Sequence, residues 1–105
     1  MRDKILTYIG FATRARQIVY GKERIRDYIK SPRKYKVLVI AKDTSERLKR
    51  DLMVRCKKGK VPYIVDFSKD DLGRILGKKE VSAVGIENDD LVKAILNVAG
   101  LERGE

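Results

Sequence analysis

A short, continuous apolar run in the middle of the chain limits what it can fold into. Residues 37–40 read Val-Leu-Val-Ile, and a run of this kind is typical of a strand in a sheet that is covered on both faces. The run ends in a turn, where Asp43, Thr44 or Ser45 can each accept a hydrogen bond from a free N–H group at the start of a helix. The segment therefore predicts a buried strand that leads into a helix.

Helix-like and strand-like segments alternate along the rest of the chain. Apolar residues recur at helical spacing in some segments, as at Ile5, Ile9 and Ala12, and gather in short β-branched runs in others. We expect helices over residues 2–16, 21–30, 44–58, 68–77 and 88–100, strands over 37–40, 61–66 and 81–86, and a short strand or extended connector over 17–20. This alternation predicts an α/β fold with a mostly parallel sheet between helices, in one domain over residues 1–105.

The positive charge is distributed unevenly along the chain. The formal net charge is +10, and residues 1–36 hold 11 of the 25 Lys and Arg residues but only 3 of the 15 Asp and Glu residues, a net of +8. A basic surface on a small protein favours a polyanionic partner, and nucleic acid is the first candidate. The alternative is an ordinary solvated surface. We expect the cations of residues 1–36 to form one basic patch.

Missing residue types exclude several kinds of site. The chain has no His and a single Cys, Cys56, so it cannot form a zinc site of Cys and His ligands or a nucleophile with a histidine base. Glycine-rich phosphate-binding and dinucleotide-binding motifs are also absent. We expect a protein that is not an enzyme and has no cofactor, metal or small-molecule substrate, with Cys56 as a buried apolar residue.

No apolar run approaches the about 20 residues that are needed to span a bilayer. The first residues lead into an amphipathic pattern rather than the apolar core of a signal peptide. We therefore expect a cytoplasmic protein with no membrane partner.

The start of the second helix, at Gly21, has the chemistry of an RNA contact. Gly21 permits close approach of a ligand to the backbone, and the free N–H groups and the positive dipole end of a helix favour phosphate oxygens. Lys22, Arg24 and Arg26 could contribute from this helix, and Arg14 and Arg16 from the end of the first helix. From a later loop, Lys78 and Lys79 could close over the RNA, and Val81 could pack against an extruded base.

Tyrosines and one aspartate allow other interpretations. Tyr20, Tyr28, Tyr35 and Tyr63 could form a base-stacking platform, although burial in or beside the core explains them more simply. Asp43 follows the central strand as a phosphoacceptor would, but helix capping is the simpler explanation.

Several short motifs occur along nearly the whole chain in a specific order and spacing. They are Ile9-Gly10-Phe11-Ala12, Arg14-Ala15-Arg16-Gln17, Gly21, Val39-Ile40-Ala41-Lys42-Asp43, Cys56, Val61-Pro62-Tyr63, Leu72-Gly73 and Gly77. This combination resembles the kink-turn RNA-binding ribosomal proteins of the L7Ae and L30e type, and among them a small bacterial, YlxQ-like branch. The resemblance implies a three-layer α/β/α sandwich with a mixed, mostly parallel central sheet of about four strands, which binds folded RNA.

The resemblance also implies where RNA binds. The site in this family combines the start of the helix after Gly21 with the loop that corresponds to Lys78–Ser82, which includes Glu80. In kink-turn readers the helix start carries Gly-x-Asn-Glu-x-x-Lys, and the same positions here hold Gly21, Glu23, Arg24 and Asp27. Only the glycine is kept. Glu23 can accept hydrogen bonds but cannot donate them as Asn does, and the charge is reversed at the other two positions.

Three hypotheses follow. The leading one is a non-enzymatic, monomeric protein that binds structured RNA, in particular ribosomal RNA. The second, motivated by Glu23, Arg24 and Asp27, is a protein-interaction adaptor that kept the fold and lost standard kink-turn reading. The third is an enzyme or receiver-like phosphoprotein that depends on Asp43.

Overall fold

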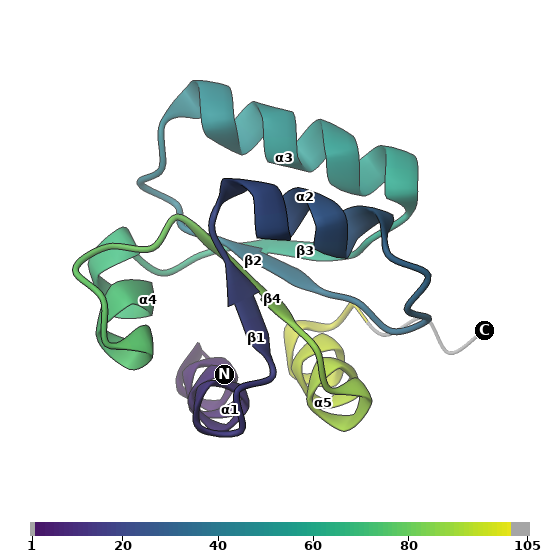
Figure 1. Ribbon diagram of the computed structural model, residues 1–105. Coiled ribbons are helices and arrows are strands. Elements are labelled where there is room, and N and C mark those ends of the chain that lie inside the picture. The colour runs from purple at the N-terminus through teal and green to yellow at the C-terminus, as the bar shows by residue number, and fades with distance from the viewer. Residues whose placement is uncertain (1, 102–105) are drawn as a thin grey trace.

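The computed structural model describes residues 2–101, in which helices and strands alternate as the sequence predicts (Figure 1). The elements are α1 (Arg2–Arg14), β1 (Ile18–Tyr20), α2 (Lys22–Lys30), β2 (Leu38–Ile40), α3 (Glu46–Gly59), β3 (Tyr63–Val65), α4 (Lys69–Leu76), β4 (Ala83–Ile86) and α5 (Asp89–Ala99). Residue 1 and residues 102–105 of the predicted domain lie outside the described part. Within residues 2–101, no helix has the length and apolar character needed to cross a membrane.

Local hydrogen bonds set the ends of these elements. α1 ends at Arg14, two residues earlier than predicted, because Arg16 adopts a left-handed φ of 58° and the N–H of Gln17 donates to the carbonyl of Ala12 at 2.8 Å. The ambiguous segment that follows contains a strand, β1. Ser45 caps α3, since its side chain accepts a hydrogen bond from an N–H group of the first turn.

Asp43 has a different partner from the predicted one. Its carboxylate accepts a hydrogen bond from the N–H of Lys69 at 2.8 Å, which joins the turn after β2 to the start of α4. Ser68 and Asp71 form a capping box at the start of α4. A receiver-like site would need further carboxylates beside Asp43, and among the described residues no group of three or more His, Cys, Asp or Glu side chains could hold a metal ion.

The sheet has four strands in the order β1-β4-β2-β3. The α/β fold and the mixed sheet are confirmed, but the expectation of mostly parallel pairing is wrong: β4 pairs antiparallel with both β1 and β2, and only β2 and β3 are parallel. The path of the chain through α4 gives the physical reason. It returns the chain to the sheet edge at which β2 and β3 end, so that Ala83, the first residue of β4, pairs with Ile40, the last of β2. β4 must therefore run back between its neighbours.

Helices cover both faces of this sheet, as predicted for an α/β/α sandwich (Figure 1). On one face, α1, α4 and α5 pack on a core that includes Ile9, Phe67 and Ile95, all fully buried. On the other face, α2 and α3 pack on Leu38 and Ile40, with Cys56 fully buried between them as predicted. The face covered by α2 and α3 carries the candidate site.

Candidate nucleic-acid interface

Among α2 to α5, only α2 begins without a side-chain cap. Ser45, Ser68 and Asn88 each accept a hydrogen bond from the first turn of the helix that follows, whereas Gly21 provides no side-chain cap for α2. Gly21 adopts a φ of 94° and a ψ of 148°, a conformation that residues with a side chain rarely adopt, and no atom lies within 4 Å of the position that a Cβ would take. The first N–H groups of α2 therefore have no side-chain cap, and uncapped N–H groups at a helix start can bind an anion.

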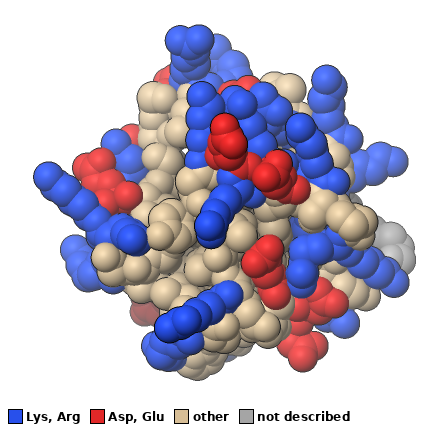
Figure 2. All heavy atoms as spheres, viewed as in Figure 1, with Lys and Arg blue, Asp and Glu red and all other residues tan. Residues whose placement is uncertain are grey.

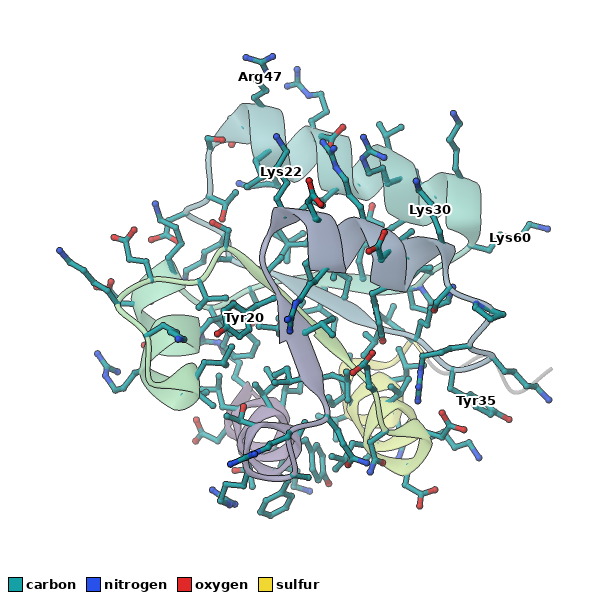
Figure 3. The ribbon with its side chains drawn as sticks, in the orientation of Figure 1. Tyr20, Lys22, Lys30, Tyr35, Arg47 and Lys60 are labelled. Carbon is teal, nitrogen blue, oxygen red and sulfur yellow. The ribbon has the colours of Figure 1, made fainter. Side chains whose placement is uncertain are left out.

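The loop before β4 lies beside this helix start. Strand β4 pairs with β1 so that Val84 faces Tyr20, the residue before Gly21. The Lys78 ammonium lies 5.7 Å from the centre of the Tyr20 ring, and Figure 3 shows Tyr20 pointing from β1 toward the side of the molecule that holds α4. The structure thus brings together the two segments on which the resemblance placed the RNA site.

Contacts with α4 and β2 fix the position of this loop. The N–H of Lys78 donates to the carbonyl of Gly73 at 2.8 Å, and the N–H of Val81 donates to the carbonyl of Lys69 at 3.1 Å. At the end of the loop, the carbonyl of Ser82 accepts from the N–H of Ala41 at 2.8 Å. Lys78, Lys79 and Glu80 remain exposed between these anchor points. The loop therefore presents its charged side chains from a rigid base.

A pocket of about 240 Å³ separates the helix start from the loop. Its walls are mainly apolar, with charged groups at the rim, and its lining residues are Tyr20, Gly21, Lys22, Ile25, Arg26, Leu48, Asp51, Leu52, Glu80, Val81, Ser82 and Ala83. It is smaller than the about 300–1,000 Å³ of pockets that hold drug-sized ligands. Its size and character suit one planar, partly apolar group, such as a nucleotide base, with its phosphate at the rim.

The predicted residues of α2 divide between two surroundings. Lys22, Glu23, Arg24 and Asp27 are exposed around the helix start. Arg26 is half-buried and turns toward α3, where its guanidinium lies 3.9 Å from the carboxylate of Asp51. The helix start therefore offers two cations and two carboxylates to a ligand, and Arg26 contributes from the groove side.

Two residues of the predicted loop are partly committed to other contacts. The Glu80 carboxylate lies 3.9 Å from the ammonium of Lys69. Val81 is 6% exposed and belongs to the core on the other face of the sheet. Val81 thus forms part of the pocket wall and offers little free surface to an extruded base.

Arg14 and Arg16 do not join this cluster. They precede β1, whereas Gly21 follows it, so the length of β1 separates them from the start of α2 (Figure 1). The Arg14 guanidinium instead lies 5.2 Å from the ring centre of Phe11, which is 43% exposed.

The cations of residues 1–36 do not form the single patch that the sequence predicts. Figure 2 shows that the Lys and Arg residues of the whole chain are spread over the displayed face, with Asp and Glu among them. Among those of residues 1–36, Arg14 and Arg16 lie at the other end of β1 from the start of α2. Arg33 lies after the end of α2 and pairs with Asp89 at 3.2 Å. Only the cations at the start of α2 contribute to the pocket and its rim.

Sequence reasoning missed the contribution of α3. Leu48, Asp51 and Leu52 line the pocket, although the spacing of the two leucines predicts only a core-facing helix side. The available signal was Arg47 and Arg50, which lie on the exposed side of the same helix turn.

The tyrosines do not form the exposed stacking platform that the sequence left open. Tyr28 is 3% exposed, and Tyr20, Tyr35 and Tyr63 are half-buried.

Comparison with known proteins identifies relatives over most of the chain. The model of the ribosomal protein L7Ae/L30e/S12e/Gadd45 family matches residues 3–95. RNA-binding protein YlxQ of Bacillus subtilis (strain 168) is 27% identical over 90 residues, which cover 86% of this chain and 89% of YlxQ.

Two solved structures share the fold. A protein of unknown function from Bacillus halodurans C superposes with a TM-score of 0.84 at 24% identity and covers 92% of this chain and 97% of its own. The 15.5kD RNA binding protein of Giardia lamblia has a TM-score of 0.73 at 21% identity, with 92% and 86% covered.

Proposed function

The chain belongs to the ribosomal protein L7Ae/L30e/S12e/Gadd45 family, and from this premise we propose that it binds structured RNA through the start of α2 and the loop Lys78–Ser82. The observation that carries the proposal is the pocket between these two segments, with an uncapped helix start on one side and an anchored, lysine-bearing loop on the other. The likeness to an RNA-binding protein, YlxQ, supports it. Both comparisons also agree with the expectation that the chain is not an enzyme.

The chemistry of the rim favours recognition through phosphate and base stacking. Lys22 and Arg24 are exposed next to free N–H groups of α2, so that a phosphate can be held by backbone and side chain together. Lys78 approaches from the loop, and the apolar wall can take one base. We propose that the ligand is a kink-turn-like RNA, with ribosomal RNA as the source. Because Glu23 and Asp27 replace the Asn and Lys of kink-turn readers, this RNA would be read by a different set of contacts.

Fluorescence anisotropy tests the proposal directly. The probes are a fluorescein-labelled RNA hairpin with a kink-turn internal loop and a hairpin of equal length that is fully paired. We expect the looped hairpin to bind more tightly, and Lys22→Ala with Arg24→Ala to weaken its binding more than tenfold, about 1.4 kcal/mol. An unchanged dissociation constant at fixed salt would remove the helix start as the site.

Arg14→Ala with Arg16→Ala is the matched control. It removes the same charge from the same third of the chain, but from the other end of β1. We expect a change of less than about threefold, because exposed charges beyond about 8–10 Å are largely screened at physiological salt. Circular dichroism would verify that both variants fold.

The adaptor hypothesis remains the second candidate because Glu23 and Asp27 place two carboxylates at the helix start, and these oppose the attraction of Lys22 and Arg24 for an RNA backbone. Affinity capture from cells distinguishes the two. Partners lost after nuclease treatment favour RNA, and sequencing of crosslinked RNA would identify it. A protein partner that survives nuclease treatment favours the adaptor.

We further propose that the protein acts as a cytoplasmic monomer. Sedimentation of the RNA-free protein would test its oligomeric state.

A further inference from the structure

A second, wider hollow lies next to the pocket, between α2 and the first half of α3. Its volume is about 800 Å³, and it is lined by Lys22, Arg26, Ser45, Arg47, Leu48, Arg50, Asp51 and Val54. We call it the α2–α3 groove. It shares Lys22, Arg26, Leu48 and Asp51 with the pocket. A chain that enters the pocket can therefore continue into the groove without leaving the protein surface.

The groove carries a strong positive charge. Four of its lining residues are cations and only one, Asp51, is an acid. The Asp51 carboxylate is already engaged, since it accepts a hydrogen bond from the Arg55 guanidinium at 3.0 Å and lies 3.9 Å from that of Arg26. Within residues 2–101, Lys22, Arg47 and Arg50 form no ion pair.

The arrangement of side chains suits a sugar–phosphate backbone. Arg47 and Arg50 are three residues apart on α3, so their Cβ atoms lie about 5–6 Å apart on one side of the helix. Lys22 projects from the start of α2 toward α3, and Arg47 rises from the first turn of α3 on the same side of the molecule (Figure 3). Val54, which is 51% exposed, and Leu48 add apolar surface to the lining of the groove. The groove therefore offers both contacts that a sugar–phosphate backbone can make: arginines for bidentate hydrogen bonds to phosphates, and apolar surface for the sugars.

We propose that the α2–α3 groove binds the phosphate backbone of the RNA that extends from the nucleotide held in the pocket. This inference rests on the proposed function and enlarges the site: the RNA contacts α3 as well as α2 and the loop Lys78–Ser82. The occupant is RNA because the groove is continuous with the pocket and because its charge is complementary to a polyanion. Arg47 and Arg50 then contribute affinity but do not read the base.

The test measures binding of the kink-turn hairpin over a series of salt concentrations. Arg47→Ala with Arg50→Ala should weaken binding about tenfold and lower the slope of log affinity against log salt by about 1.4–1.8, because each phosphate contact contributes about 0.7–0.9. The preference for the looped over the fully paired hairpin should not change. Both arginines are exposed, so the fold should tolerate the substitutions.

Lys57→Ala with Lys58→Ala is the matched control. It removes two exposed cations from the same helix, outside the groove. We expect less than a threefold change, which is about 0.65 kcal/mol. Equal losses in the two double variants would overturn the proposal, because binding would then reflect diffuse attraction to a basic helix.

The helix-start variant separates this inference from the proposed function. If Lys22→Ala with Arg24→Ala weakens binding while Arg47→Ala with Arg50→Ala does not, the groove is not an RNA site and is left for another partner, such as an acidic protein segment. If neither double variant weakens binding, the proposed RNA site is itself wrong, and the groove proposal fails with it.

Discussion

A methyl group on Gly73 would lie 2.8 Å from the backbone carbonyl oxygen of Lys79. Gly73 is inside α4, where glycine is about 1 kcal/mol less favourable than alanine, and this close approach explains why glycine stands there. Gly73→Ala must displace the loop, because the carbonyl of Lys78 is equally close. We expect it to lower the free energy of unfolding by about 1–3 kcal/mol and to weaken RNA binding, as measured by urea unfolding and anisotropy.

Gly10→Ala provides the control for this prediction. Gly10 is also inside a helix, but the nearest atom to an added Cβ is the flexible Arg14 guanidinium at 3.8 Å, an ordinary contact. We expect Gly10→Ala to stabilise the protein by about 0.4–1 kcal/mol and to leave RNA binding unchanged. If both variants changed RNA affinity alike, the contact between α4 and the loop would not be what positions the loop.

The hydroxyl of Tyr28 holds α2 to the sheet. It donates to the carbonyl of Ile86 at 2.6 Å and accepts from the N–H of Val37 at 3.0 Å, and burial raises the pKa of Tyr28 to about 12. Tyr28→Phe leaves both backbone groups without this partner in a buried place. We expect a loss of about 1–3 kcal/mol in unfolding free energy, with Tyr63→Phe, which is only partly buried, within about 0.5 kcal/mol of the parent.

The carboxylate of Asp66 makes stability depend on acid pH. Burial alone would raise its pKa, but hydrogen bonds from the N–H of Phe67 at 2.7 Å and from Arg2 at 3.1 Å outweigh burial and hold the pKa below its usual value of 3.8. Because the folded state favours the ionised form, this stabilisation is present above pH 3.8 and is lost as the pH falls through the lower, folded pKa.

Asp66→Asn should remove this pH dependence. We expect the parent to be more stable than the variant at about pH 6, and the difference to shrink as the pH is lowered toward about 2.5 in urea unfolding experiments. A stability difference that stayed constant over this range would mean that ionisation of Asp66 does not contribute.

Local signals in the sequence were sufficient to locate the elements but not to orient them all. The apolar spacing of α1 and the cap of α3 at Ser45 are properties of neighbouring residues, and the structure has both as predicted. The sequence does not reveal the direction of β4. All of its residues are buried, so no local pattern tells whether the strand runs parallel or antiparallel to its neighbours. This direction depends on the path of the chain through α4, which the pattern of neighbouring residues does not specify.

The candidate site was predictable only where the chain itself brings its parts together. Gly21, Lys22 and Arg24 are adjacent in sequence and remain so in the fold. The charge density of residues 1–36 was misleading, because β1 separates the site from Arg14 and α2 separates it from Arg33. Arg47 and Arg50 mark an exposed basic side of α3, but whether that side adjoins the site depends on how α3 packs against α2, which the local sequence does not express.

Gly21→Ala tests whether the open helix start is used for binding. The backbone at Gly21, with φ of 94°, is strained for alanine, so we expect a loss of about 1–3 kcal/mol in stability. No other part of the described protein lies within 4 Å of the added methyl. In the proposed complex this methyl would hinder the approach of a phosphate to the start of α2. RNA affinity measured below the unfolding transition should therefore fall at least about tenfold. Gly100→Ala is the control. Gly100 follows α5 in the left-handed backbone conformation, with similar open space around an added Cβ, so the substitution should lower stability but leave affinity unchanged. If Gly21→Ala lost stability and kept its affinity, the glycine would be needed for the turn between β1 and α2 and not for contact with RNA.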